Sequence, residues 1–291
     1  MTFGVLFWIA TLLYGGCLAL LGYNCYWYSY KQERYKNFYV AAFYVFSIII
    51  VISRFASYLV LLVVFYQSSL HSDTLLLAQT VQGIAIYADI CLGMIQVAAM
   101  RVLTLQLRGE FPDSIERKEK QIYCVVIAMT ITLWIGVGID TVLASVCEHK
   151  AKKEDNDSLK CLTNGVSKQG AQYINGTLFL LLFVLMVITV VPLSRVLRKV
   201  AKNQTLSSNV KWLTSIFGLF TFAFMSRAIY DYATKIGNNF WTVFLGLSLP
   251  LIWDFLPIFM MSLLHYRDAM VERKEVERDN SWNASMIESK S

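Results

Sequence analysis

The stretch that decides the fold is Thr221–Met261, which contains SRAIYD at residues 226–231 and PLIWDFLP at residues 250–257. Its composition predicts two apolar helices joined by a short turn. An arginine and two aspartates lie among residues otherwise suited to lipid. Because a charge at the centre of a bilayer costs about 2.5–3.5 kcal/mol on insertion scales, such charges normally face the interior of a helix bundle and pair. The stretch therefore predicts the polar centre of a membrane bundle.

Two prolines, Pro250 and Pro257, bracket Asp254 within the second of these helices. A proline has no backbone N–H, so the carbonyls of Gly246 and Trp253 lose their helical partners. Carbonyl groups at membrane depth must be satisfied by protein or by water. We therefore expect the prolines to kink this helix and to leave carbonyls available to other groups.

The whole chain has the composition of a polytopic membrane protein. Hydrophobic residues make up 56% of its 291 residues, and runs of about 20 apolar residues, enough to cross a hydrocarbon core of about 30 Å, recur along it. We predict an all-α, seven-helix transmembrane domain over residues 1–266 and a charged, partly disordered tail over residues 267–291. The predicted spans are 3–28, 38–66, 74–105, 121–146, 172–197, 211–234 and 240–265.

Lysine and arginine are concentrated in the first, third and fifth predicted loops and in the C-terminal tail. By the positive-inside rule these segments are cytosolic and the N-terminus is outside or lumenal, which is the layout of a G-protein-coupled receptor. The basic residues are scattered between spans and do not indicate nucleic-acid binding. They suit an anionic lipid or an acidic partner, and the ordinary positive-inside distribution also explains them. The predicted cytosolic basic face consists of Arg108, Arg117, Lys118, Arg195, Arg198 and Lys199.

The fourth predicted loop lies on the non-cytosolic side and holds two cysteines, Cys147 and Cys161. Disulfides persist in such compartments, so we expect a bridge between them, with two free thiols as the alternative. The same loop contains Asn156-Asp157-Ser158, which has the pattern of an N-glycosylation acceptor.

Five charged residues lie inside the predicted spans. Arg54, Asp89, Arg227 and Asp254 fall at middle depth, and Asp231 lies one helical turn from Arg227 on the same face. We predict a buried polar network with one carboxylate in excess. Arg54 should reach an acidic side chain or a carbonyl, and Arg227 should contact Asp254, Asp231 or both. Three roles for this network remain open. Its members could be fixed ion pairs, pairs that re-form during a conformational change, or a proton or ion pathway.

The sequence also excludes several chemistries. The three histidines, His71, His149 and His265, lie at span ends or in a loop, which argues against transmembrane haem and against an intramembrane zinc hydrolase. The seventh span has no lysine for a retinal Schiff base. No phosphate-binding loop and no Gly-x-Ser-x-Gly elbow occurs. We find no catalytic constellation and expect neither an enzyme nor a cofactor.

Four short motifs resemble those of one family of seven-helix membrane proteins: LYG at residues 13–15, SRF at 53–55, SRAIYD at 226–231 and IWDFLP at 252–257. The family comprises the plant tobamovirus multiplication proteins (the THH/TOM domain) and related animal orphan receptor-like proteins of lysosomal membranes. The resemblance implies a non-enzymatic protein of the vacuole, lysosome or plasma membrane. It also implies recruitment of cytosolic partners, notably small GTPases of the Arf-like or Rag type.

Two functions follow as hypotheses. The first is a receptor-like scaffold or signalling protein that binds cytosolic protein through its third and fifth loops. The alternative is a small transporter or proton-coupled channel that uses Asp89, Asp231 and Asp254, which requires a water-lined cavity reaching those aspartates. Whether the intramembrane network is fully paired is the feature that separates the two.

Overall fold

The computed structural model describes residues 2–31, 38–67, 72–109, 117–131, 134–135, 166–201, 207–233, 240–267 and 270. The regular structure in these ranges is helical. The elements are α1 (Thr2–Lys31), α2 (Phe38–Gln67), α3 (Ser72–Leu107), α6 (Val166–Ala201), α7 (Ser207–Ala233), α8 (Phe240–Pro250) and a π-helix, η2 (Leu251–Phe255). Residues 117–131 are also helical, and the helix that begins with α8 continues beyond η2 to residue 267.

Six helices in the described ranges are long and apolar enough to cross a membrane. A helix of 30 residues, such as α1 or α2, is about 45 Å long and exceeds the hydrocarbon core of about 30 Å. The chain therefore fits a multi-pass membrane protein in a lipid bilayer. The first part of the predicted fourth span is helical to residue 131, and most of its remainder lies outside the described residues. The count of seven spans thus stays a prediction.

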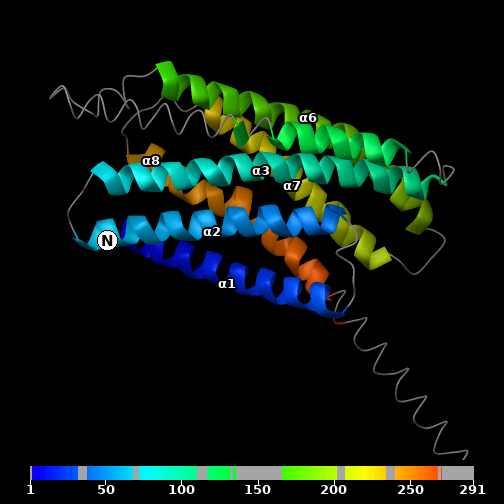
Figure 1. Ribbon diagram of the computed structural model, residues 1–291, viewed down its shortest axis with the longest axis horizontal. Coiled ribbons are helices and arrows are strands. Elements are labelled where there is room, and N and C mark those ends of the chain that lie inside the picture. The colour runs from blue at the N-terminus through cyan, green and yellow to red at the C-terminus, as the bar shows by residue number, and fades with distance from the viewer. Residues whose placement is uncertain are drawn as a thin grey trace, which may run out of the picture.

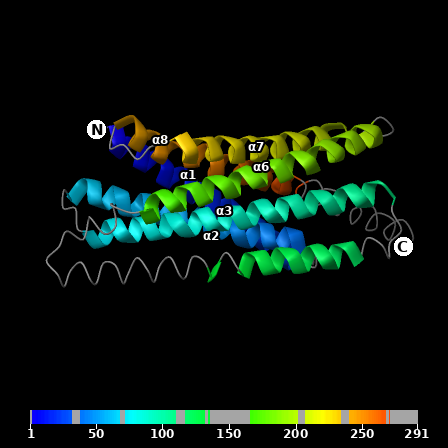
Figure 2. The same cartoon turned by 90° about the horizontal axis from the view of Figure 1, so that it is seen from above.

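The helices form one elongated bundle (Figures 1 and 2). Consecutive helices lie side by side, α1 with α2 and α2 with α3, and α3 then packs against α6, which packs against α7. The π-helix contacts α1, α2 and α7. The segment PLIWDFLP therefore lies at the centre of the bundle, as its buried charge predicts.

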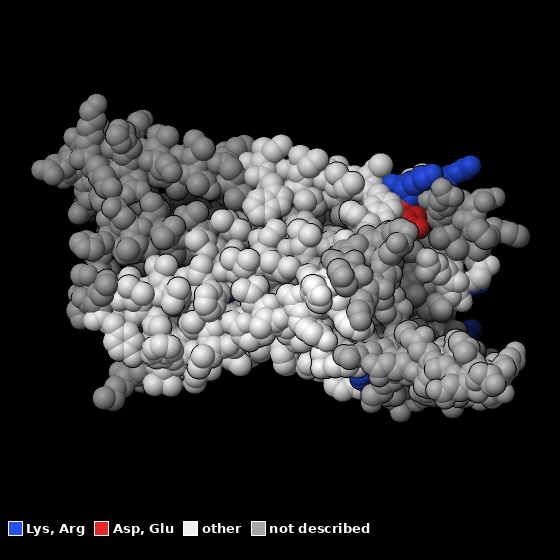
Figure 3. Space-filling view, turned by 60° about the horizontal axis from the view of Figure 1, so that its bottom comes forward, with Lys and Arg blue, Asp and Glu red and all other residues white. Residues whose placement is uncertain are grey.

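The outer surface of the bundle is apolar, as expected of a surface that faces lipid. Leu12, Ile188 and Ile229 are each more than half exposed. Figure 3 shows that charged side chains on the visible face gather at the end of the bundle where α1, α3 and α6 finish. Inside, close packing rather than hydrophobicity must hold helices together in lipid. Gly93 illustrates this, because a Cβ there would lie 2.8 Å from the ring of Phe224.

Candidate functional site: a buried charge cluster

Four charged side chains meet in the middle of the bundle and form what we call the charge cluster: Arg54, Asp89, Arg227 and Asp254. They come from α2, α3, α7 and η2 respectively. Each is buried, with between 1% and 4% of its surface exposed. Four elements that are far apart in sequence are therefore joined by charge at one point.

The cluster is a chain of alternating charges. Arg54 Nε donates to Asp254 Oδ2 at 2.5 Å, and Arg227 Nη1 donates to Asp254 Oδ1 at 3.0 Å. The same Nη1 also donates to Asp89 Oδ2 at 2.8 Å. Two guanidinium groups thus balance two carboxylates, and Asp254 binds both arginines. Charge-assisted bonds of this kind are strong where water is excluded, and removing one partner leaves an uncompensated charge.

Two aromatic rings also lie close to the guanidinium group of Arg227. The guanidinium carbon lies 4.3 Å from the centre of the Phe179 ring, on α6, and 5.5 Å from the Trp253 ring. Both distances are within the range of a cation–π interaction. Trp253 Nε1 in turn donates to Ser226 Oγ at 2.8 Å, which fixes the indole against α7. The cluster consequently reaches α6 through Phe179.

The two prolines bracket a π-helical turn instead of acting as simple kinks. In η2 the Leu256 N–H donates to the carbonyl of Leu251, five residues back, so the turn holds one residue more than an α-helical turn. Trp253 and Asp254, which are neighbours in sequence, are both buried as a result. Turns of this type are frequent at functional sites.

Two tyrosines bind the backbone beside the π-helix. Tyr14, from α1, donates to the carbonyl of Pro250 at 3.0 Å, and Tyr58, from α2, donates to the carbonyl of Leu247. The two rings stack with centroids 5.6 Å apart. The sequence predicts free carbonyls at Gly246 and Trp253, whereas the carbonyls that the tyrosines bind are those of Leu247 and Pro250.

Asp231 lies outside the charge cluster, which corrects the predicted network of five. It is half-buried and makes no ion pair with another described residue, and its Cβ lies against α6 at Gly176. An arginine four residues before an acid is also the less favourable order on a helix. Arg227 reaches instead across to α3 and η2, where two carboxylates are available. The predicted excess of one carboxylate therefore does not occur within the cluster.

A cavity of about 420 Å³, which we call the end cavity, opens between helices at the basic end of the bundle. Tyr44 and His265 join α2 to the final helix beside it, with 2.9 Å between Tyr44 Oη and His265 Nδ1. Met261 and His265 are on the same helix as Asp254, and Met261 lies about 10 Å further along it. The lining residues of the cavity are Tyr39, Val40, Phe43, Gln96, Ala99, Leu103, Leu107, Leu197, Leu213, Phe217, Met261, Leu264 and His265.

The remaining predicted residues fall into two groups. Cys147, Cys161 and Asn156 lie outside the described residues, so the disulfide and the glycosylation stay predictions. The six residues of the predicted cytosolic basic face are all described and exposed, and they lie near the ends of α3 and α6 and at the start of the helix of residues 117–131. In the part of the chain that the structure describes, no three His, Cys, Asp or Glu side chains come together in a way that could hold a metal ion.

Sequence reasoning missed three residues of the site. Tyr58 lies four residues after Arg54, and this helical spacing on one face was an available signal. Tyr14 is part of the motif LYG, but nothing in that motif indicates a bond to Pro250. Phe179 lies in a long apolar run without any distinguishing neighbour.

Comparisons of this chain with protein-family models, with curated proteins and with solved structures find no match. The resemblance to the tobamovirus multiplication proteins therefore stays a prediction that rests on the four short motifs.

Proposed function

We propose that this protein is a receptor-like membrane scaffold that recruits a cytosolic protein at the basic end of its bundle. The observation on which this rests is that one helix takes part in both the charge cluster and the end cavity. Asp254 ties that helix to two arginines, and Met261, Leu264 and His265 line the cavity further along it. A protein that fills the cavity would therefore act on a helix whose position depends on buried ion pairs.

The pairing within the cluster supports a scaffold over a conducting protein. Both carboxylates are buried against guanidinium groups, and within the described residues each arginine of the cluster has an acidic partner. A binding partner can shift such a bundle between two states only if it binds them with different affinity. The π-helical turn holds Asp254 within the final helix, and turns of this type are frequent at functional sites.

Charge supports the proposed orientation and the class of partner. Exposed lysines and arginines gather at the end of the bundle where the end cavity opens (Figure 3), and the positive-inside rule assigns such an end to the cytosol. A partner with an acidic surface fits it, and the family resemblance favours a small GTPase of the Arf-like or Rag type. The same resemblance favours a vacuolar, lysosomal or plasma membrane.

The test is to fill the end cavity. Leu264→Trp places a large ring in it, whereas Leu263→Trp, one residue earlier and 36% exposed, is the matched control. Full-length protein in detergent is incubated with GTP-loaded Arf-like and Rag-type GTPases. We expect capture to fall at least about tenfold for Leu264→Trp and to stay unchanged for Leu263→Trp, because the ring occupies the space of a contacting group. Equal capture by both variants would contradict the proposal.

A proton-coupled transporter remains the second candidate, because Asp89 and Asp254 share one guanidinium nitrogen. Proteoliposomes with an internal pH dye decide between the two. A scaffold should show no proton flux above that of empty liposomes. Flux that Asp89→Asn abolishes, with insertion unchanged, would favour the transporter.

A further inference from the structure

A second cavity, which we call the membrane-facing groove, opens on the side of the bundle between α3, the helix of residues 117–131 and α6. Its volume is about 430 Å³, which is within the range of small-molecule sites. It shares no lining residue with the end cavity or the charge cluster. Its lining residues are Met94, Val97, Ala98, Arg101, Leu105, Lys118, Gln121, Ile122, Val125, Val126, Met129, Leu185 and Thr189.

The length of the groove matches one leaflet of a bilayer. Its wall on α3 runs from Met94 to Leu105, and its wall on the facing helix runs from Lys118 to Met129. Eleven residues of helix rise about 16 Å, which is close to half of a hydrocarbon core of about 30 Å. Val125 and Met129 are 56% and 41% exposed, so the groove is reached from the outer surface of the bundle.

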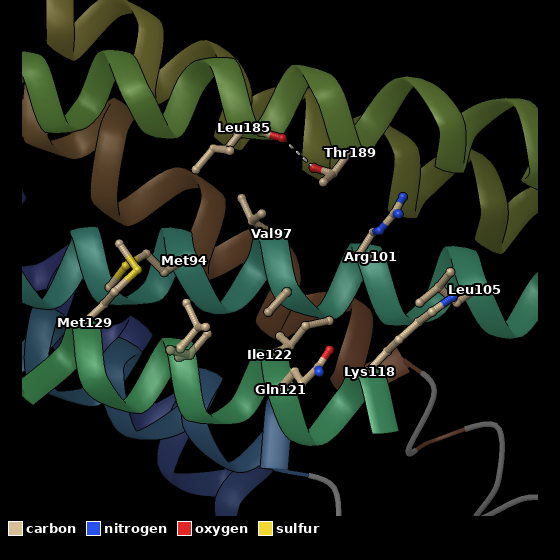
Figure 4. Close-up of a pocket in the computed structure, with 13 residues that line it drawn as sticks. Met94, Val97, Arg101, Leu105, Lys118, Gln121, Ile122, Met129, Leu185 and Thr189 are labelled. Atoms are coloured by element: carbon tan, nitrogen blue, oxygen red, sulfur yellow. Dashed lines mark hydrogen bonds between the residues drawn. The ribbon is translucent and has the colours of Figure 1, made fainter. Parts of the chain in front are cut away.

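The polar groups of the groove are concentrated at one end. Figure 4 shows Arg101 and Lys118 in the same half of the groove, on facing helices, and Met94 and Met129 at the opposite end. Both cationic side chains are exposed. Thr189, further along, already donates to the carbonyls of Leu185 and Met186. Apart from the neutral polar groups of Gln121 and Thr189, the groove is therefore apolar along its length and cationic at one end.

The cationic end is also the end near the membrane surface. Arg101 lies six residues, or about 9 Å, before the end of α3, which is the end of the bundle that carries the exposed basic residues. A long arginine side chain at that depth extends towards the headgroups. Its planar guanidinium group binds phosphate through two parallel hydrogen bonds, and lysine binds phosphate as a point charge.

We propose that the membrane-facing groove binds one anionic phospholipid, with its phosphate held by Arg101 and Lys118 and an acyl chain lying along the apolar walls. Charge complementarity at one end, apolar walls elsewhere and a length of one leaflet together fit this amphiphile. A zwitterionic phospholipid has the same phosphate, but its headgroup cation would lie near Arg101 and Lys118, and free phosphate would leave the apolar walls uncovered. The site shares Lys118 with the predicted cytosolic basic face, but the lipid binding does not rest on the recruitment function proposed above.

Native mass spectrometry of the full chain in detergent tests the headgroup. The protein is titrated with phosphatidylserine and, separately, with phosphatidylcholine. The double variant Arg101→Gln/Lys118→Gln should bind phosphatidylserine at least about tenfold more weakly than the unmodified chain. Arg195→Gln/Arg198→Gln removes the same net charge from exposed positions outside the groove and should leave the affinity unchanged. Arg101→Lys should restore part of the affinity.

A second pair of variants tests the acyl chain. Val125→Trp fills the groove, whereas Ile127→Trp, two residues further and 47% exposed, lies outside it. The first should lose retained lipid and the second should keep it.

Three results would overturn the proposal. Equal loss in the two double variants would mean that net charge, not this site, attracts the lipid. Equal affinity for phosphatidylcholine would mean that the site does not select a lipid of net negative charge. Displacement of lipid by inorganic phosphate, with Val125→Trp unaffected, would mean an anion site without an acyl chain.

Discussion

The charge cluster and the membrane-facing groove both place arginine in an apolar bundle, but they stabilise the guanidinium group differently. Arg54 and Arg227 are 4% exposed and bind carboxylates. Arg101 is exposed and lies about 9 Å from the end of α3. An arginine at the centre of a bundle needs a protein anion, whereas one near the surface can reach water or headgroups. The first kind fixes helix packing, and the second is available to a ligand.

The largest expected effect comes from removing the central arginine. Arg227→Ala leaves two buried carboxylates close together with only Arg54 to balance them, and breaking a buried pair costs about 3–5 kcal/mol. We expect a loss of folded, membrane-inserted protein and a lower free energy of unfolding in detergent titrations. Ile229→Ala, on the same helix and 58% exposed, is the control. If the two variants behaved alike, the cluster would not be the centre of the fold.

The two aspartates should differ, because Asp254 binds both arginines and Asp89 binds one. Asp254→Asn removes the charge that neutralises Arg54, whereas Asp89→Asn leaves each arginine with Asp254. We expect Asp254→Asn to be less stable than Asp89→Asn by about 1.5–3 kcal/mol, the size of a charge-assisted hydrogen bond. Unfolding of the two variants in the same detergent measures the difference. The reverse order would show that Asp89 is the main anion of the cluster.

Much of this arrangement could be predicted from sequence, and the failures have physical causes. Long apolar runs reveal the spans, and a charge at middle depth must pair, so Arg54, Arg227 and Asp254 could be expected to face inward. Helical spacing placed Asp231 beside Arg227, but spacing does not say which of two carboxylates a long side chain will reach.

Other features depend on packing between distant segments. The two prolines predict that the α-helical hydrogen bonds are interrupted. Several hydrogen-bond patterns are compatible with such an interruption, so the π-helical pattern of η2 could not be deduced from the sequence. The position of Phe179 over Arg227 depends on how α6 lies against α7, which no local pattern encodes. The groove depends on three helices at once and has no signal in any single segment.

Smaller effects are expected where neutral groups hold the π-helix. Tyr14→Phe and Tyr58→Phe each remove one hydrogen bond to a carbonyl and keep the ring stacking, so each should lower the free energy of unfolding by about 0.5–1.5 kcal/mol. Tyr23→Phe, at a side chain that is 40% exposed, serves as the control. A loss as large as that of Arg227→Ala would mean that the tyrosines, more than the ion pairs, position the final helix.

The smallest effect on the protein alone is expected at Arg101, and this sharpens the comparison with Arg227. Because Arg101 is exposed, Arg101→Gln should leave the melting temperature in lipid-free detergent unchanged. A ligand that binds only the folded state stabilises it in proportion to the logarithm of its concentration. Phosphatidylserine should therefore raise the melting temperature of the unmodified chain and of Arg195→Gln, but raise that of Arg101→Gln much less. Destabilisation of Arg101→Gln without lipid would place this arginine with the packing arginines of the cluster, and the distinction between the two regions would fail.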